Sequence, residues 1–160
     1  SAAPAPQASS APPQASSLKP QVSLDNLKAA VDADPASVAA RVAYADALDK
    51  AKRAPEAREQ LEKAVEMAPE REDVQLKVGT SRFQTKDVAG ATEAFKLAME
   101  INPKNPRTYF YLGDLLAMQK DVEGQKKIFQ QLLAQNINEK TNVQARQMLR
   151  RLEGARPAAQ

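Results

Sequence analysis

The side chains that most often perform catalysis are missing from this chain. Its 160 residues include no histidine and no cysteine. That absence excludes Ser-His and Cys-His nucleophile pairs, imidazole acid-base catalysis, thiolate and imidazole metal sites, and disulfides. Any enzymatic chemistry would therefore rest on carboxylates, lysine, tyrosine or hydroxyl groups.

Carboxylates do occur in close pairs, but the pairs do not have the character of catalytic ones. They are Asp32 with Asp34, Glu62 with Glu66, and Glu72 with Asp73. All fall on expected surfaces or turns, whereas a catalytic acid and base need two environments that push their pKa values apart. The sequence also lacks a Gly-rich phosphate loop, a Gly-x-Ser-x-Gly elbow and a calcium-binding loop. We therefore expect no enzyme, no cofactor and no metal site.

The charge balance argues against a nucleic-acid-binding protein. The chain has 23 basic and 20 acidic residues, and its net charge of +3 comes from residues 136–160. That segment carries Lys140, Arg146, Arg150, Arg151 and Arg156 against Glu139 and Glu153. A basic helix can bind nucleic acid or anionic lipid. However, arginines near a helix C-terminus also complement the helix dipole. In addition, no aromatic residue lies between these basic residues to stack on a base. We expect no nucleic-acid partner and, without a long apolar run, no membrane insertion.

The two ends of the chain differ in composition from the middle. Residues 1–22 are almost wholly Ala, Pro, Ser and Gln, a composition too poor in bulky apolar side chains to fold, so we expect a disordered linker. It is either a spacer that holds the next domain away from an anchor or a dispensable tail. We expect residues 154–160 to form a flexible tail. Because the chain opens on Ser1 rather than Met, we also expect that a signal peptide, an anchor or another segment was removed.

The middle of the chain repeats every 34 residues. Pro35, Pro69 and Pro103 are spaced by this period. Other columns keep the same register: Ala57 with Ala91; Leu61 with Phe95 and Phe129; Ala64 with Ala98; and Ala45 with Gly79 and Gly113. A fixed period of this length is typical of stacked helical repeats.

Each repeat has the pattern of two helices joined by a tight turn. In the third repeat Asn105 can cap a helix that starts at Pro106, and Asp121 can cap the next helix, as Asp87 can one repeat earlier. Gly79 and Gly113 fall inside expected helices, where glycine costs roughly 1 kcal/mol relative to alanine. We expect close helix-to-helix approach at both positions.

This pattern resembles the tetratricopeptide repeat family, whose signature runs through both helices of a repeat. The third repeat matches it with Tyr109, Leu112, Gly113, Leu116 and Phe129, and the second with Gly79, Ala91, Phe95 and Pro103. The departures are Arg41, Gln75, Gln125 and Ile137.

The resemblance implies an all-α, right-handed α-solenoid of antiparallel helix pairs with about eight helices. The solenoid would cover residues 23–153 as a half-repeat over 23–35, repeats over 36–69, 70–103 and 104–137, and a closing helix over 139–153. Thr141 to Gln144 has the form of a capping box for that last helix.

In this family the first helices of the repeats line a concave groove, so the resemblance also implies a binding surface. Columns at i, i+4 and i+7 lie on one stripe of each first helix. The candidate partner-binding residues are Val42, Asp46, Asp49, Leu76, Thr80, Phe83, Arg107, Phe110, Asp114 and Met118. The alternative is that some of these side chains are core or are covered by the chain's own tail.

Two further observations bear on the partner. Some family members hold the C-terminal carboxylate of large chaperones with Lys and Asn, whereas Val42 and Asp46 stand at two of those positions here, so we expect a different partner. Arg82 occupies the column of Leu48 and Leu116. It either grips a partner's carboxylate or packs its aliphatic stem while its head reaches water.

The first hypothesis is therefore a non-catalytic scaffold that binds a peptide or helix of a partner protein in the groove. The second is a structural solenoid that self-assembles into a homo-oligomer. The third is an envelope assembly factor, because the half-repeat start and the Ala/Pro spacer are similar to the periplasmic repeat modules of bacterial cytochrome c maturation systems. The compartment would be the bacterial periplasm or envelope, or the cytoplasm.

Overall fold

The structure, a computed structural model, describes residues 23–154, and these residues form eight α-helices and no strand. The helices are α1 (Leu24–Ala33), α2 (Val38–Lys50), α3 (Ala54–Met67), α4 (Glu72–Gln84), α5 (Val88–Ile101), α6 (Pro106–Met118), α7 (Val122–Gln135) and α8 (Glu139–Gly154). The linker expected over residues 1–22 lies outside the described residues, as does all of the expected tail except Gly154, which ends α8.

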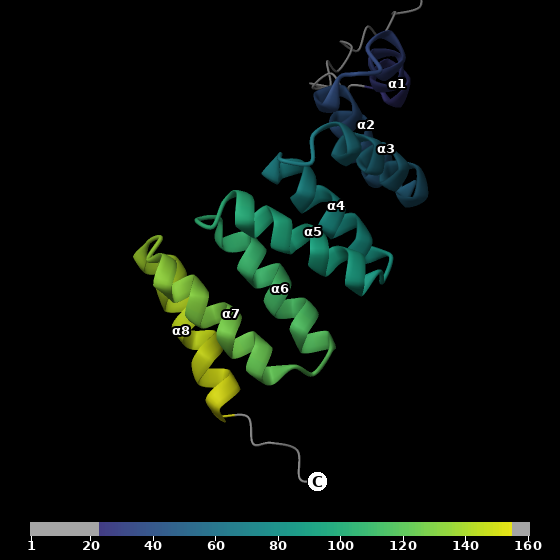
Figure 1. Cartoon of the computed structure of the whole chain (residues 1–160). Helices are drawn as coiled ribbons and strands as arrows, with labels where there is room; N and C mark the ends of the chain where they lie inside the picture. Colours follow the sequence, from purple (N-terminus) through teal and green to yellow (C-terminus); the bar gives the residue numbers. More distant parts are fainter. Residues whose placement is uncertain (1–22, 155–160) are drawn as a thin grey trace, which may run out of the picture.

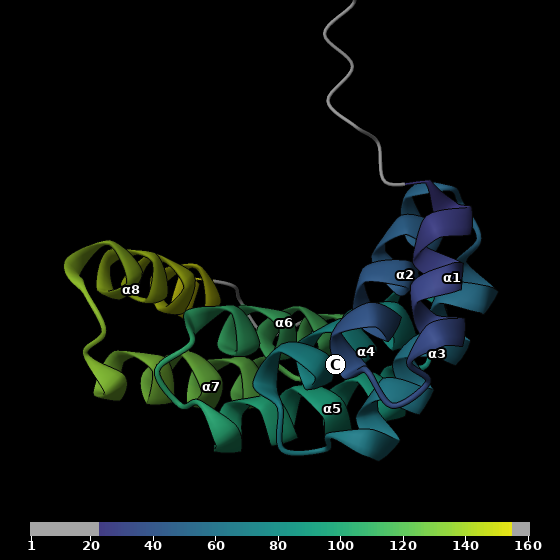
Figure 2. The same ribbon diagram turned by 90° about the horizontal axis from the view of Figure 1, so that it is seen from above.

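The helices pack as a one-dimensional series in chain order. α2 with α3, α4 with α5, and α6 with α7 form three hairpins, while α1 packs mainly on α2 and α8 mainly on α7. Figure 1 shows the hairpins side by side, with α1 and α8 at opposite ends of the row. Seen from above, the row is curved, so that α1 with α2 and α8 rise on the same side of α4 to α7 (Figure 2). The expected all-α solenoid of helix pairs is confirmed.

Side-chain caps fix most of the helix starts. Ser23 accepts a hydrogen bond from the Asn26 amide at 3.2 Å, and Asp87 and Asp121 accept from the amides of Gly90 and Gly124. These caps satisfy backbone donors that have no partner within the helix. Asn105 caps α6, as its sequence position predicts.

The closing helix starts differently from the prediction. Thr141 does not cap α8, because the helix begins at Glu139 and the Asn138 side chain accepts from the Thr141 amide at 2.9 Å. Thr141 is buried instead. The capping-box prediction at Thr141 is therefore wrong by three residues.

The turn inside each repeat has one backbone conformation. Lys52, Lys86 and Lys120 have φ of 63°, 63° and 59°, in the left-handed region that glycine adopts most easily. The residue after each lysine donates its backbone N–H to the carbonyl four residues before that lysine, with all three N···O distances at 2.9 Å. Three lysines thus hold a strained conformation that reverses the chain between paired helices.

The glycines of α4 and α6 allow the close helix approach that their sequence positions predict. A Cβ atom built on Gly79 would lie 2.6 Å from the Phe95 ring, and one built on Gly113 would lie 2.6 Å from the Phe129 ring. Both rings are buried. The large aromatic side chain of each second helix therefore occupies the space that a side chain on the first helix would need.

The fourth residue of each first helix makes the same contact although its residue type changes. The side chains of Arg41, Gln75 and Tyr109 each donate a hydrogen bond to the carbonyl of the proline six residues earlier, at 2.8 Å in all three cases. The acceptors are Pro35, Pro69 and Pro103. Arginine and glutamine therefore replace the usual aromatic residue without losing the hydrogen bond that ties each helix to the preceding loop.

Candidate functional site

A concave pocket of about 240 Å³ opens between the first helices α2, α4 and α6. It is lined by Asp46, Asp49, Leu61, Asp73, Leu76, Lys77, Thr80, Arg107 and Tyr111. The lining comes from all three repeats, so the pocket exists only when the repeats stack.

Five of the ten candidate residues line this pocket, and five do not. Asp46, Asp49, Leu76, Thr80 and Arg107 belong to its wall. The residues outside the wall are Val42, Phe83, Phe110, Asp114 and Met118. The set expected from sequence is thus divided between the pocket, the core and the exposed end of α6.

The apolar column of the expected groove packs toward the next repeat. Val42 packs against the buried cluster that contains Val74 and Val78 of α4. Leu76 is only 9% exposed, contrary to the expectation of an exposed groove residue, and it belongs to a buried cluster with Leu112 and Leu115. These side chains hold one repeat against the following one.

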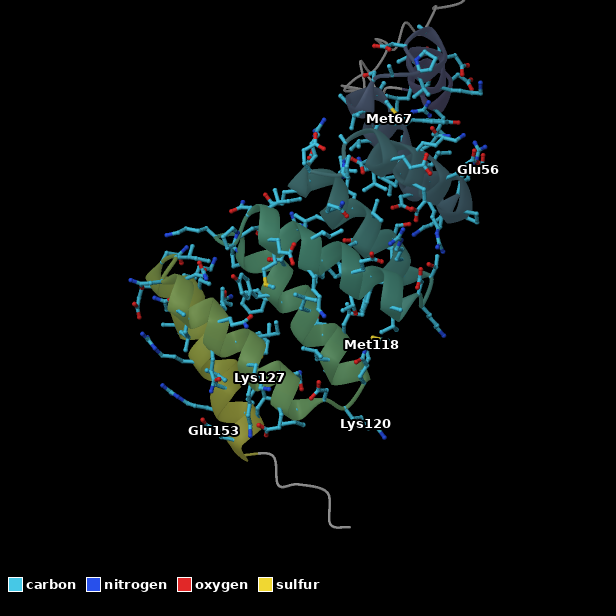
Figure 3. All side chains as sticks on the ribbon, in the orientation of Figure 1. Glu56, Met67, Met118, Lys120, Lys127 and Glu153 are labelled. Carbon is cyan, nitrogen blue, oxygen red and sulfur yellow. The ribbon has the colours of Figure 1, made fainter. Side chains whose placement is uncertain are left out.

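Phe83 and Phe110 also serve packing. Phe83 packs against the cluster that contains Leu76, and Phe110 packs against Phe129, with ring centroids 5.9 Å apart. Met118 and Asp114 are both exposed, Met118 to 55%. Figure 3 labels Met118, the last residue of α6. Partial burial of the Asp114 carboxyl raises its pKa above the ordinary value, although the residue as a whole is exposed.

Sequence reasoning missed three pocket residues of the first helices, Asp73, Lys77 and Tyr111. Lys77 and Tyr111 lie one position after Leu76 and Phe110 and are spaced by the same period of 34 residues. Asp73 precedes Arg107 by that period. The signal was therefore present as a second periodic column, rotated by one residue from the one expected to face the groove.

Ion pairs already engage several of the pocket's charges. Lys77 Nζ lies 2.5 Å from Asp46 Oδ1 and so bridges α4 and α2. Arg71 donates two hydrogen bonds to Asp73, at 3.0 and 2.6 Å, and these bonds hold the pKa of the Asp73 carboxyl below its ordinary value. Asp49 and Arg107 form no ion pair among residues 23–154.

Arg107 lies against an aromatic side chain. Its guanidinium carbon is 6.0 Å from the centroid of the Tyr111 ring, and its Nη2 is 3.4 Å from the Tyr111 hydroxyl. Tyr111 in turn stacks on Phe95, with centroids 4.7 Å apart and planes 8° from parallel. A chain of contacts thus runs from a cation at the pocket to the buried core of the second repeat.

Arg82 is engaged in hydrogen bonds within the solenoid. Its guanidinium donates to both carboxylate oxygens of Glu62 on α3, at 3.0 and 2.8 Å, and to the Gly90 carbonyl on α5 at 3.2 Å. The hydrogen bonds to Glu62 raise the pKa of Arg82 further above its ordinary value. The Arg82 side chain therefore joins α3, α4 and α5 of the first two repeats, and its guanidinium group is hydrogen-bonded to protein atoms.

Metal sites and membrane-spanning helices are both absent from the part of the chain that the structure describes. Within residues 23–154, no group of three or more acidic, histidine or cysteine side chains is placed to hold a metal ion. None of the eight described helices has the length and apolar character needed to cross a membrane.

Comparison with known families and structures agrees with this geometry. Two family models described as tetratricopeptide repeat match residues 19–78 and 53–106, which together cover more than half of the chain. A search of curated proteins found no match.

Several solved structures are similar in fold. A crystal structure of MamA superposes with a TM-score of 0.65 at 14% identity, covering 81% of this chain and 84% of that one. The first TPR of Spaghetti (RPAP3) bound to an HSP90 peptide gives 0.59 at 20% identity, over 72% and 92% of the two chains. YrrB, described as a TPR protein with an unusual peptide-binding site, gives 0.66 at 16% identity, over 82% and 68%.

Proposed function

The chain belongs to the tetratricopeptide repeat family, and from that premise we propose that it is a non-catalytic scaffold that binds a peptide segment of a partner protein between α2, α4 and α6. Two of the similar structures are described as peptide-binding. The observation that carries the proposal is the concave pocket itself, where Arg107 lies against Tyr111 and forms no ion pair among residues 23–154.

The pocket's chemistry limits which peptides fit. Tyr111 provides most of the apolar surface, and the small exposed parts of Leu61 (4% exposed) and Leu76 (9% exposed) add to it, which favours a peptide with an apolar side chain. Complete burial of such a side chain of the peptide contributes about 1.5 to 3 kcal/mol to the binding free energy. Arg107 is near the N-terminal end of α6, where the helix dipole also favours an anion, so an acidic group of the peptide belongs there.

The acidic side chain of Asp49 also lines the pocket. Asp49 is one residue from the C-terminal end of α2 and has no ion-pair partner in the described residues. A basic group of the peptide would lie beside it, since both the carboxylate and the end of the helix dipole favour a cation. The proposed ligand is thus a short segment with an apolar residue between a basic and an acidic one.

The test begins with the full chain and a displayed library of short random peptides. An enriched peptide, labelled with a fluorophore, is titrated with the wild-type chain and with Arg107→Ala. Loss of a charge-assisted hydrogen bond costs about 1.5 to 3 kcal/mol, so binding should weaken by about tenfold or more. Lys96→Ala is the matched control, because Lys96 is an exposed cation on the second helix α5.

A second variant separates pocket binding from binding elsewhere. Thr80→Lys adds bulk and charge at the pocket wall without touching the buried clusters. Circular dichroism checks that the variant stays helical. Equal affinity of the wild-type chain, Arg107→Ala and Thr80→Lys for every enriched peptide would contradict the proposed site.

A further inference from the structure

Lys77 is a cation in the lining of the pocket between α2, α4 and α6. It lies on α4, the middle one of these three first helices. The residues 34 positions before and after it are Ala43 and Tyr111. The repeat architecture therefore does not require a lysine at this position, because the other two repeats fold without one.

Lys77 neutralises one carboxylate of the pocket. Its Nζ lies 2.5 Å from Oδ1 of Asp46 on α2. The side chain of Lys77 is 35% exposed and that of Asp46 is 45% exposed, so solvent and a ligand can reach both. An ion pair this exposed contributes less than about 1 kcal/mol to stability. The pair therefore matters more for the charge of the pocket than for folding.

A second carboxylate lies one helical turn away on α2. Asp49 follows Asp46 by three residues, which places the two side chains on the same side of the helix. Both side chains line the pocket, and Asp49 forms no ion pair among residues 23–154. The pocket thus has two neighbouring carboxylates, and Lys77 neutralises one of them.

The third carboxylate of the pocket lining is also engaged. Arg71 donates two hydrogen bonds to Asp73, at 3.0 and 2.6 Å. Within the described residues, Asp49 and Arg107 are therefore the lining charges that a ligand meets without competition from an ion pair. A segment with one basic and one acidic group matches these two charges.

A second basic group of the ligand would have to compete with Lys77 for Asp46. Because Lys77 belongs to the same chain, its effective concentration at Asp46 exceeds that of a peptide in dilute solution. Its ammonium group also repels a cation that approaches Asp46. Removal of the Lys77 charge would leave Asp46 and Asp49 as adjacent free carboxylates, which favour a ligand with two basic groups.

We propose that Lys77 determines the charge specificity of this pocket, because it occupies Asp46 and so restricts the ligand to a segment with a single basic group. The inference rests on the proposed peptide-binding function and names the residue that limits the ligand. Lys77 acts as a built-in counter-ion of the pocket and disfavours segments with two neighbouring basic residues. This discrimination weakens as salt rises.

The experiment selects peptides from one displayed library of short random sequences, against the wild-type full chain and against Lys77→Met. Methionine keeps an aliphatic side chain and removes the charge, and Lys77→Gln is a second variant with a polar side chain. Lys77 is half-buried, so circular dichroism and urea unfolding check that both variants fold.

Two matched controls separate the Asp46 pair from a general effect of charge. Asp46→Asn/Lys77→Met removes both members of the pair and leaves the net charge of the pocket lining unchanged. Lys96→Met removes one charge at an exposed position of α5, outside the pocket.

Peptides enriched on Lys77→Met or Lys77→Gln should contain, on average, one more basic residue than peptides enriched on the wild-type chain. Labelled with a fluorophore, they should bind these variants at least about threefold more tightly than they bind wild type. Raised salt should reduce the difference. Both controls should keep the wild-type preference.

An unchanged preference in Lys77→Met and Lys77→Gln overturns the proposal, as does the same shift in either control. Peptides enriched on wild type are also titrated with Thr80→Lys. If Thr80→Lys weakens their binding while the Lys77 variants keep the wild-type preference, the pocket binds peptides and only the role of Lys77 is wrong. If no peptide is enriched, or Thr80→Lys binds as tightly as wild type, the proposed function fails and this inference fails with it.

Discussion

The close approach of α4 and α5 gives a quantitative test of how the repeats pack. In Gly79→Ala, the new Cβ would lie 2.6, 2.7 and 2.9 Å from Cε1, Cδ1 and Cζ of Phe95. The ring cannot move away easily, because Phe95 is fully buried and stacks on Tyr111 at a centroid distance of 4.7 Å. Helix propensity and packing therefore act in opposite directions at this position.

The magnitudes decide the sign. Alanine gains about 1 kcal/mol over glycine in a helix interior, whereas overpacking a core costs about 1 to 3 kcal/mol. Three contacts below 3.0 Å place Gly79→Ala near the upper end of that cost, so we expect a net loss of about 1 to 2 kcal/mol in the free energy of unfolding. Gly113→Ala meets Phe129 with only one contact below 3.0 Å, at 2.6 Å, and should lose less.

The first repeat provides the control, because it already has alanine and a smaller side chain at the same two positions. Ala45 and Leu61 stand where the second repeat has Gly79 and Phe95. The double variant Gly79→Ala/Phe95→Leu should therefore be more stable than the sum of the single changes predicts, by about 1 kcal/mol or more. Urea unfolding followed by circular dichroism measures all four proteins. A Gly79→Ala variant more stable than wild type, or strictly additive changes, would refute the packing argument.

Two further predictions concern stability. Lys86→Gly relieves the positive φ at the turn and should stabilise the chain by up to about 1 kcal/mol. The control Lys96→Gly lies in the middle of α5 and should destabilise the chain by about 1 kcal/mol. Thermal unfolding compares the two variants, and a destabilising effect of Lys86→Gly would contradict the strain at the turn. Because Arg71 lowers the folded-state pKa of Asp73 from 3.8, the stabilisation by this carboxylate is complete above its unfolded-state pKa and is lost as the pH falls through the folded value. Asp73→Asn should thus lower the free energy of unfolding at neutral pH, by less than about 1 kcal/mol because Asp73 is exposed. At strongly acid pH the variant should match wild type. A difference that stays constant across the pH range would exclude the Asp73 carboxylate as the cause.

The sequence predicts the fold because its packing pairs recur at one spacing. Gly79 with Phe95 and Gly113 with Phe129 are two instances of one contact, and a glycine inside a helix is costly unless close packing requires it. Repetition converts a long-range contact into a periodic pattern that can be read along the chain. Arg82 and Glu62 form a pair that occurs once, with no equivalent in the other repeats, so no column predicts it.

The groove was harder to predict because a period does not fix the rotation of a helix about its axis. Successive residues of a helix are about 100° apart, so Leu76 faces the next repeat while Lys77, its neighbour, reaches across to Asp46. The apolar column expected in the groove therefore packs mostly toward the next repeat, although Leu76 also lines the pocket. In a solenoid the first helices pack against both their own partner and the next repeat, so apolar columns are needed for packing before any remain for a ligand.

This division of the first helices determines which pocket residues can change independently of the fold. Arg107 and Thr80 lie at the pocket wall and belong to none of the buried clusters, so substitutions there can alter binding while the core remains intact. Tyr111 is different, because the face that stacks on Phe95 and the hydroxyl near Arg107 belong to one ring. A change at Tyr111 should therefore alter stability and binding together, and so should a change at Leu61 or Leu76, which line the pocket and belong to buried clusters.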